Sequence, residues 1–142
     1  INFTSKIEKA QLELIKLMLN SNEQMKEYIK ESISEDLLTV PFLKKIYEII
    51  KDINLPIESS SIIEYFKDKN EREFIIKMFF ETVTETSIEE IVFDCLKILK
   101  SEPIKQQISD IRVKIREKES KGESSFKELT SLAELRKKLN DL

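Results

Sequence analysis

Short amphipathic segments follow one another along the whole chain, and several of them open with a serine that has Glu or Gln three residues later. A serine hydroxyl at a helix start accepts a hydrogen bond from a free N–H of the first turn, and this spacing is the capping box. The serines with this spacing are Ser5, Ser21, Ser61, Ser87 and Ser125. The pattern predicts an all-α fold in which these serines begin helices.

Within each segment the apolar residues recur at intervals of three and four, which places them on one side of an α-helix. Residues 33–39 form a predicted loop, and the third helix is expected to open around Pro41 and to stop before Pro56. The other predicted helices near the N-terminus are about 5–19, 22–32, 59–67, 70–84 and 87–100. Six short helices joined by short loops predict a compact six-helix bundle. Its predicted core includes Tyr28, Phe79, Phe80, Val83 and Cys95.

The last forty residues carry a different pattern, which begins at Pro103, a predicted helix start or kink. The apolar positions that follow are Ile104, Ile108, Ile111 and Ile115, and they fall in a strip roughly 60° wide. Most of the remaining side chains of this arm are charged. A seam this narrow can contact one partner helix.

Gly122 stands where the first arm should end, because glycine readily adopts the left-handed conformation of a helix C-terminus. A second arm restarts near Ser125. Its apolar positions spread over roughly 200°, more than the narrow seam of the first arm can cover. They are Phe126, Leu129, Leu132, Ala133, Leu135, Leu139 and Leu142. We therefore expect a two-helix hairpin at 103–142 after a bundle at 1–102, with some leucines facing the bundle, another chain or water.

The composition argues against catalysis by this part of a protein. No histidine is present, which removes the commonest general base and metal ligand, and one glycine does not build a phosphate-binding loop. Cys95 is the only cysteine and lies on an apolar helix face, so we interpret it as a core residue. We expect no enzyme activity, metal or cofactor in this chain.

Charge and hydropathy give further expectations about location and partners. The chain has 24 basic and 27 acidic residues, so strong direct binding to nucleic acid is not expected. No apolar run approaches the roughly 18 residues of a membrane span, and the lone cysteine fits a reducing cytoplasm. Because the chain begins at Ile1, we interpret it as a fragment of a longer protein or as a processed one.

Three stretches, AQLELIKLMLNSNEQMKEYI, the proline-started FLKKIYEIIKDI and FIIKMFFE, resemble the start of the C-terminal domain of bacterial DNA primase. The ending ISDIRVKIREKESKGESSFKELTSLAELRKKLNDL is similar to the closing hairpin of that domain. The likeness covers essentially the whole chain. It rests on the order and spacing of apolar helices rather than on an invariant motif.

The resemblance implies a helicase-binding domain. In that family a helical bundle is followed by a hairpin that docks on the N-terminal domains of the ring-shaped replicative helicase, and so recruits primer synthesis to the replication fork. The hairpin supplies most of the affinity and the bundle modulates the helicase. The zinc-binding and magnesium-dependent RNA-polymerising domains of primase would lie before Ile1, so the parent protein would be the nucleotidyltransferase.

The resemblance carries over to a region of this chain, because the contact residues of the family are not a fixed signature. The expected contacts lie on the outward face of the hairpin, on both sides of the turn. They are Arg116, Lys118, Glu119, Phe126, Leu129, Leu132, Leu135, Arg136 and Leu139.

Two alternatives stay open at this point. The N-terminal domain of the replicative helicase resembles the primase bundle and also has a hairpin behind it. A helical regulatory or nucleic-acid-binding module could instead use the basic run from Arg112 to Lys121 on phosphates. Residues 102–142 have ten basic and eight acidic side chains, a net charge of +2, against −5 for 1–101.

Overall fold

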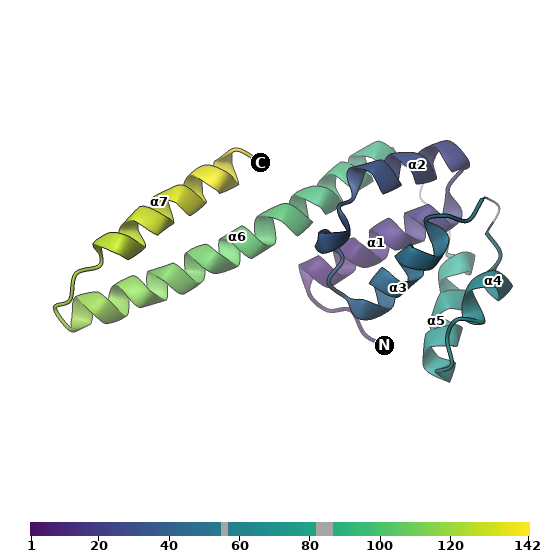
Figure 1. Ribbon diagram of the computed structural model, residues 1–142, viewed down its shortest axis with the longest axis horizontal. Helices are drawn as coiled ribbons and strands as arrows, with labels where there is room; N and C mark the ends of the chain where they lie inside the picture. Colours follow the sequence, from purple (N-terminus) through teal and green to yellow (C-terminus); the bar gives the residue numbers. More distant parts are fainter. Residues whose placement is uncertain (55–56, 82–86) are drawn as a thin grey trace. The chain divides into compact units, whose positions relative to one another are not determined.

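The computed structural model describes residues 1–54, 57–81 and 87–142 (Figure 1). Every regular element in these ranges is helical, so the prediction of an all-α fold is confirmed. The elements are α1 (Lys6–Asn20), α2 (Glu23–Ser32), the 3₁₀ turn η1 (Glu35–Leu37), α3 (Pro41–Ile50), α4 (Ser59–Ile63), α5 (Lys69–Phe80), α6 (Ile88–Ser120) and α7 (Phe126–Asn140).

The described chain divides into two compact units, Ile1–Leu96 and Lys97–Leu142. The first is a bundle of α1 to α5 with the first turns of α6, and the second is the hairpin of α6 and α7. This agrees with the predicted helical bundle followed by a hairpin. The predicted boundary between residues 102 and 103, however, falls inside α6 and inside the second unit.

Ser5, Ser87 and Ser125 each stand directly before a helix as predicted, and the first two cap it with their side chains. The hydroxyl of Ser5 accepts a hydrogen bond from the Glu8 backbone N–H at 3.1 Å, and Ser87 accepts one from the Glu90 N–H at 3.4 Å. Each bond satisfies one of the N–H groups that a first helical turn leaves without an intrahelical partner. The capping-box spacing was therefore a correct signal at these two positions.

The prediction that a serine begins the helix was wrong at two other positions, Ser21 and Ser61. Asn22, not Ser21, caps α2, and its side-chain oxygen accepts from the Met25 N–H at 2.8 Å. Asparagine is as good a cap as serine, and it stands one residue closer to the helix. Ser61 lies within α4, which already begins at Ser59.

The bundle core is centred on α1, which contacts α2, α3 and α5. Residues Leu14, Ile15 and Met18 of α1 are fully buried, and fully buried isoleucines from α2, α3 and α5 complete the core. Met18 lies four residues after Leu14 and three after Ile15, so these three side chains share one side of α1. The broad apolar faces predicted from the sequence therefore meet in one core.

A buried glutamine ties α1 to the start of α3. The side-chain oxygen of Gln11 accepts hydrogen bonds from the backbone N–H groups of Thr39 and Val40, both at 3.0 Å. Its amide nitrogen donates to the Thr39 hydroxyl at 2.8 Å. All three bonds hold a completely buried polar group that would otherwise be costly to desolvate. Gln11 thereby sets the position at which the chain enters α3.

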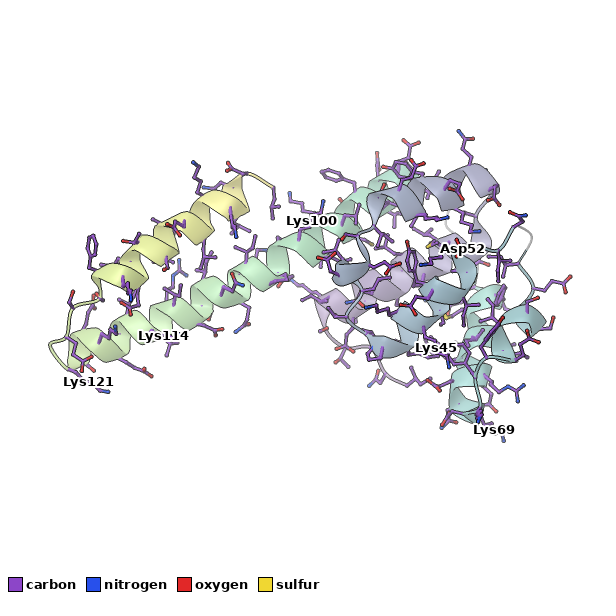
Figure 2. All side chains as sticks on the ribbon, viewed as in Figure 1. Lys45, Asp52, Lys69, Lys100, Lys114 and Lys121 are labelled. Atoms are coloured by element: carbon purple, nitrogen blue, oxygen red, sulfur yellow. The ribbon has the colours of Figure 1, made fainter. Side chains whose placement is uncertain are left out.

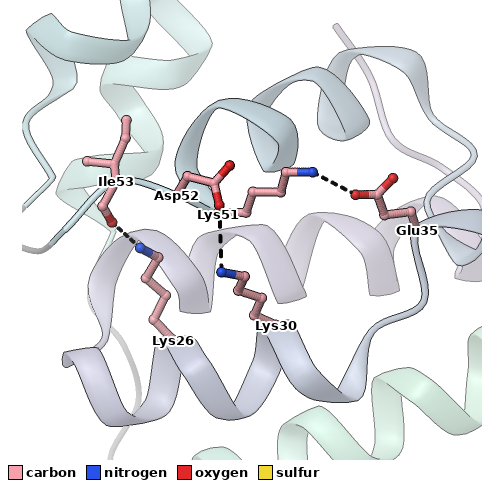
Figure 3. Close-up of polar contacts among 6 residues, drawn as sticks. All are labelled: Lys26, Lys30, Glu35, Lys51, Asp52 and Ile53. Atoms are coloured by element: carbon pink, nitrogen blue, oxygen red, sulfur yellow. Dashed lines mark hydrogen bonds and ion pairs between the residues drawn. The ribbon is translucent and has the colours of Figure 1, made fainter.

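A buried lysine ties α2 to the end of α3 (Figure 3). The ammonium group of Lys26, which is 1% exposed, donates to the backbone oxygen of Ile53. A cation is favourable there, because the carbonyl groups after a helix carry the negative end of its dipole. Beside it, Lys30 and Asp52 form an exposed ion pair at 3.8 Å. Such exposed pairs contribute little, so Lys26 is the main polar link.

Several predicted details of the bundle were wrong or fall outside the description. Tyr28 and Phe80 were expected in the core, but they are 41% and 81% exposed. Neither α4 nor α5 extends as far as expected: they end at Ile63 and Phe80, and Val83 lies outside the described residues. Residues in the last turn of a helix, such as Phe80, can match the apolar pattern without a neighbour to cover them.

Pro103 neither starts nor ends a helix, because α6 continues through it to Ser120. A proline inside a helix removes one backbone hydrogen bond and costs about 3 kcal/mol. Buried residues lie on both sides of it, with Val92 and Cys95 before it and Ile108 and Ile115 after it. Packing of these apolar residues offsets the local cost, so the helix continues through the proline.

Gly122 ends α6 in a Schellman motif. Its φ is +70°, its N–H donates to the Glu119 oxygen at 3.1 Å, and the Glu123 N–H donates to the Lys118 oxygen at 2.9 Å. These two bonds satisfy carbonyl groups that the end of a helix leaves free. The only glycine of the chain therefore lies where the backbone is left-handed, as its position predicted.

Replacing Gly122 by alanine should destabilise the hairpin by about 1 kcal/mol, because an L-residue is strained at positive φ. A Cβ at this site would have no heavy atom within 4 Å, so the loss measures backbone strain without a steric clash. Gly122→Asn should cost less, since asparagine tolerates the left-handed region. Hydrogen-exchange protection of the α7 amides reports the change. Equal losses for the two variants, or none for alanine, would contradict this origin.

Candidate docking surface on the hairpin

The two arms of the hairpin meet along one apolar seam. In Figure 1, α7 runs back along the C-terminal part of α6. Ile108 and Ile115 of α6 and Leu132 of α7 are less than a tenth exposed and form its centre. Four partly buried residues pack against them, namely Ile104, Ile111, Leu135 and Leu139. All four apolar positions predicted for the first arm therefore lie in the seam.

The seam leaves part of the second arm uncovered. Phe126 is 77% exposed and Leu129 is 48% exposed, and Leu142 at the end of the chain is also about half exposed. Their exposure confirms that the wide apolar face of α7 exceeds what α6 covers. Phe126 and Leu129 are three residues apart and therefore neighbours on the surface of α7, and exposed apolar side chains that lie side by side are typical of interaction sites.

Three of the predicted contact residues are not on an outward face. Leu132 is only 8% exposed at the centre of the seam, so its assignment to the outward face was wrong. Leu135 and Leu139 are half-buried against the same seam. The wide apolar pattern of α7 could not separate these three leucines from Leu129, because the separation depends on where α6 lies.

Helical geometry divides the rest of the hairpin surface into two sides. Each residue turns by about 100°, so the residues just before and just after a seam position fall on opposite sides of it. Asp110 and Glu134 precede the seam residues Ile111 and Leu135, and both line a groove between the arms. The residues that follow the two seam positions therefore share the other side.

This other side is rich in arginine, and we call it the arginine face. It carries Arg112 and Arg116 from α6 and Arg136 from α7, with Glu119 on the same strip of α6 and Leu129 on the same strip of α7. All five side chains are exposed. Within the described parts of the chain, none of the three arginines makes an ion pair.

The arginine face brings together four of the predicted contact residues: Arg116, Glu119, Leu129 and Arg136. It adds Arg112, which the sequence placed in a basic run but not among the contacts. The signal that could have identified Arg112 is its position directly after the seam residue Ile111. Phe126 lies further round α7, on the side away from the seam.

Lys118, another predicted contact, forms an ion pair between the two arms of the hairpin. Its ammonium group pairs with the Glu128 carboxylate at 2.5 Å and so links the end of α6 to the first turns of α7. The same glutamate was expected to complete a capping box with Ser125, but Ser125 makes no side-chain capping bond. The hydrogen bond with Lys118 is the largest cause that lowers the pKa of Glu128.

The lowered pKa of Glu128 predicts that the hairpin loses stability in acid. The contribution of the Lys118–Glu128 pair is fully present above the usual glutamate pKa of 4.5 and disappears as the pH falls through the lower pKa of the folded state. Far-UV circular dichroism and exchange of α7 amides against pH should show this loss. The Glu128→Gln variant should lack it, whereas the exposed Glu117→Gln control should keep it. Identical acid profiles for the wild type and Glu128→Gln would contradict the assignment.

The difference in net charge is larger between the two structural units than between residues 1–101 and 102–142. The unit Lys97–Leu142 contains 12 basic and 8 acidic residues, a net charge of +4. The unit Ile1–Leu96 contains 12 basic and 19 acidic residues, a net charge of −7. Figure 2 shows Lys100, Lys114 and Lys121 along α6, all in the basic unit. A basic hairpin favours partners with an acidic surface.

Other chemical features of the described residues concern the lone cysteine, possible metal ligands and the hydropathy of the helices. Cys95 is buried, and burial raises the pKa of its thiol to about 11, so the reactive thiolate is scarce at neutral pH. In residues 1–54, 57–81 and 87–142, no three histidine, cysteine or carboxylate side chains gather as metal ligands would. No helix in those ranges has the length and apolar character to cross a bilayer.

Comparisons with known proteins leave the family assignment open. No protein-family model matches the sequence, and searches of curated proteins and of solved structures found no significant match. The likeness to the helicase-binding domain of primase therefore rests on the residues of this chain alone.

Proposed function

We propose that this chain is a protein-interaction domain of a bacterial DNA primase, and that its hairpin docks on the N-terminal domains of the replicative helicase. The observation that carries the proposal is the arginine face, which combines the exposed Leu129 with three exposed arginines that form no ion pair within the described residues. Leucine and arginine together suit a protein surface that is apolar at its centre and acidic at its rim. The resemblance supplies the identity of the partner.

Burial distinguishes the apolar residues that hold the hairpin together from those that are available for contact. The seam residues Leu132, Leu135 and Leu139 hold the two arms together, whereas Leu129 and Phe126 are available for contact. Arginine contributes strongly at interfaces because its planar guanidinium forms paired hydrogen bonds with carboxylates. Arg112, Arg116 and Arg136 would therefore orient the partner, and the two apolar side chains would supply the buried contact.

Titration calorimetry of the chain against the N-terminal domains of the cognate helicase, over a series of salt concentrations, tests this proposal. Docking through apolar and arginine side chains predicts saturable binding that weakens moderately with salt. Single-stranded DNA serves as the competing ligand in a parallel titration. Tight DNA binding with a steep linear fall of log K against log salt would instead favour the phosphate-binding alternative. Absence of binding to the helicase domains would overturn the proposal.

A further inference from the structure

The side of the hairpin opposite the arginine face holds a groove between α6 and α7, with a volume of about 430 Å³. Its floor includes two half-buried apolar residues, Ile111 and Leu135, which also pack against the seam. Lys118 and Glu128 form an ion pair, so these two charged residues lie at the same level of the antiparallel hairpin. Ile111 lies seven residues before Lys118 on α6, and Leu135 lies seven residues after Glu128 on α7. Ile111 and Leu135 therefore also lie at one level.

Four exposed charges line the walls of this groove in a regular order. On α6, Lys114 lies towards the turn and Asp110 lies away from it. On α7, Glu134 lies towards the turn and Lys138 lies away from it. Each wall therefore has one positive and one negative charge, and the order of the signs is reversed between the walls.

This alternating arrangement is complementary to itself. When a second identical groove is turned over onto the first, either with the turns at the same end or at opposite ends, every lysine faces a carboxylate of the other copy. In the first case Lys114 faces Glu134 and Asp110 faces Lys138, and in the second Lys114 faces Asp110 and Glu134 faces Lys138. The apolar floors meet at the centre in both cases. Two-fold interfaces require this kind of self-complementary surface.

We propose that the groove is a self-association surface, and that its occupant is the groove of a second copy of this chain. Two hairpins that meet in this way form a four-helix arrangement in which Ile111 and Leu135 become fully buried. The arginine face lies on the other side of each hairpin and stays accessible. Self-association is therefore independent of the proposed docking on the helicase.

Two charge-uniform variants test the proposal on the full chain. Lys114→Glu with Lys138→Glu makes both walls acidic, and Asp110→Lys with Glu134→Lys makes both walls basic. All four side chains are exposed, so the fold should be retained, which circular dichroism checks. A control matched to the acidic variant, Lys121→Glu with Lys137→Glu, makes the same change in net charge on exposed residues outside the groove.

Sedimentation equilibrium at low ionic strength gives the readout. The wild type and the control should form reversible dimers that weaken with salt. Each charge-uniform variant alone should associate about tenfold more weakly or worse, because four facing pairs become repulsive. An equimolar mixture of the two variants should restore a one-to-one dimer in either orientation of the hairpins.

Any of the following results would overturn the proposal: a wild type that stays monomeric at millimolar concentration, charge-uniform variants that dimerise as the wild type does, or a control that loses dimerisation as they do. A mixture that remains monomeric would do the same. Helicase binding, measured on the same variants, should be retained. A loss of dimerisation with helicase binding intact separates this surface from the docking surface.

Discussion

Leu129→Asp is expected to weaken binding to the helicase N-terminal domains by about 2 kcal/mol, or roughly 30-fold in Kd. Leu129 is half exposed on the arginine face, so it is free to enter an apolar pocket of the partner. An aspartate there would place a charge in that pocket and would oppose an acidic rim. Titration calorimetry measures the change directly.

The hairpin offers a close control for this variant. Val113 on α6 is as exposed as Leu129, at 48%, and helical geometry places it on the side of α6 away from the seam. Val113→Asp introduces the same charge on the other arm, so it should leave the affinity nearly unchanged. Equal losses for the two variants would show a general effect of negative charge, and no loss for Leu129→Asp would remove it from the docking surface.

Leu132→Ala is expected to destabilise the hairpin by about 2–3 kcal/mol. Leu132 is the only α7 residue at the buried centre of the seam, between Ile108 and Ile115, and truncation there leaves a cavity. Exchange protection of α7 amides should fall accordingly. The bundle core lies in the other unit, so amides of α1 and α3 should keep their protection.

A Leu→Ala change at an exposed position of α7 serves as a control. It separates the stability lost with buried packing from the effect of the changed helix propensity. Leu129→Ala removes the same atoms from a half-exposed site and should cost less than about 1 kcal/mol. The two leucines thus have opposite expected roles: Leu132 should govern stability and Leu129 should govern binding. A larger loss of stability for Leu129→Ala than for Leu132→Ala would mean that the seam is assigned to the wrong residues.

Much of the local structure could be predicted because it depends on neighbours in sequence. The capping bonds of Ser5 and Ser87, the left-handed Gly122 and the apolar strip from Ile104 to Ile115 all involve residues within about three turns of a single helix. Propensity and periodicity act over that distance. The same information failed at Pro103, where packing on both sides carries α6 through the proline.

The candidate site was predictable only as a region. The sequence identified the hairpin and its excess of apolar surface, but it assigned Leu132 and Lys118 to the outward face. The structure uses both inside the hairpin, Leu132 in the seam and Lys118 in its pair with Glu128. A helical pattern defines which residues share a side, and only the position of the neighbouring helix decides which side is covered.

By itself, the sequence determined the helical class, the hairpin turn at Gly122 and the mismatch in apolar width between the two arms. These features follow from the order of residues along single helices. Tertiary structure alone decided that Arg136 of α7 joins Arg112 and Arg116 of α6 on one face and that four charges line the opposite groove. Such groupings arise when α7 packs antiparallel to α6, because that packing sets residues about 24 positions apart side by side.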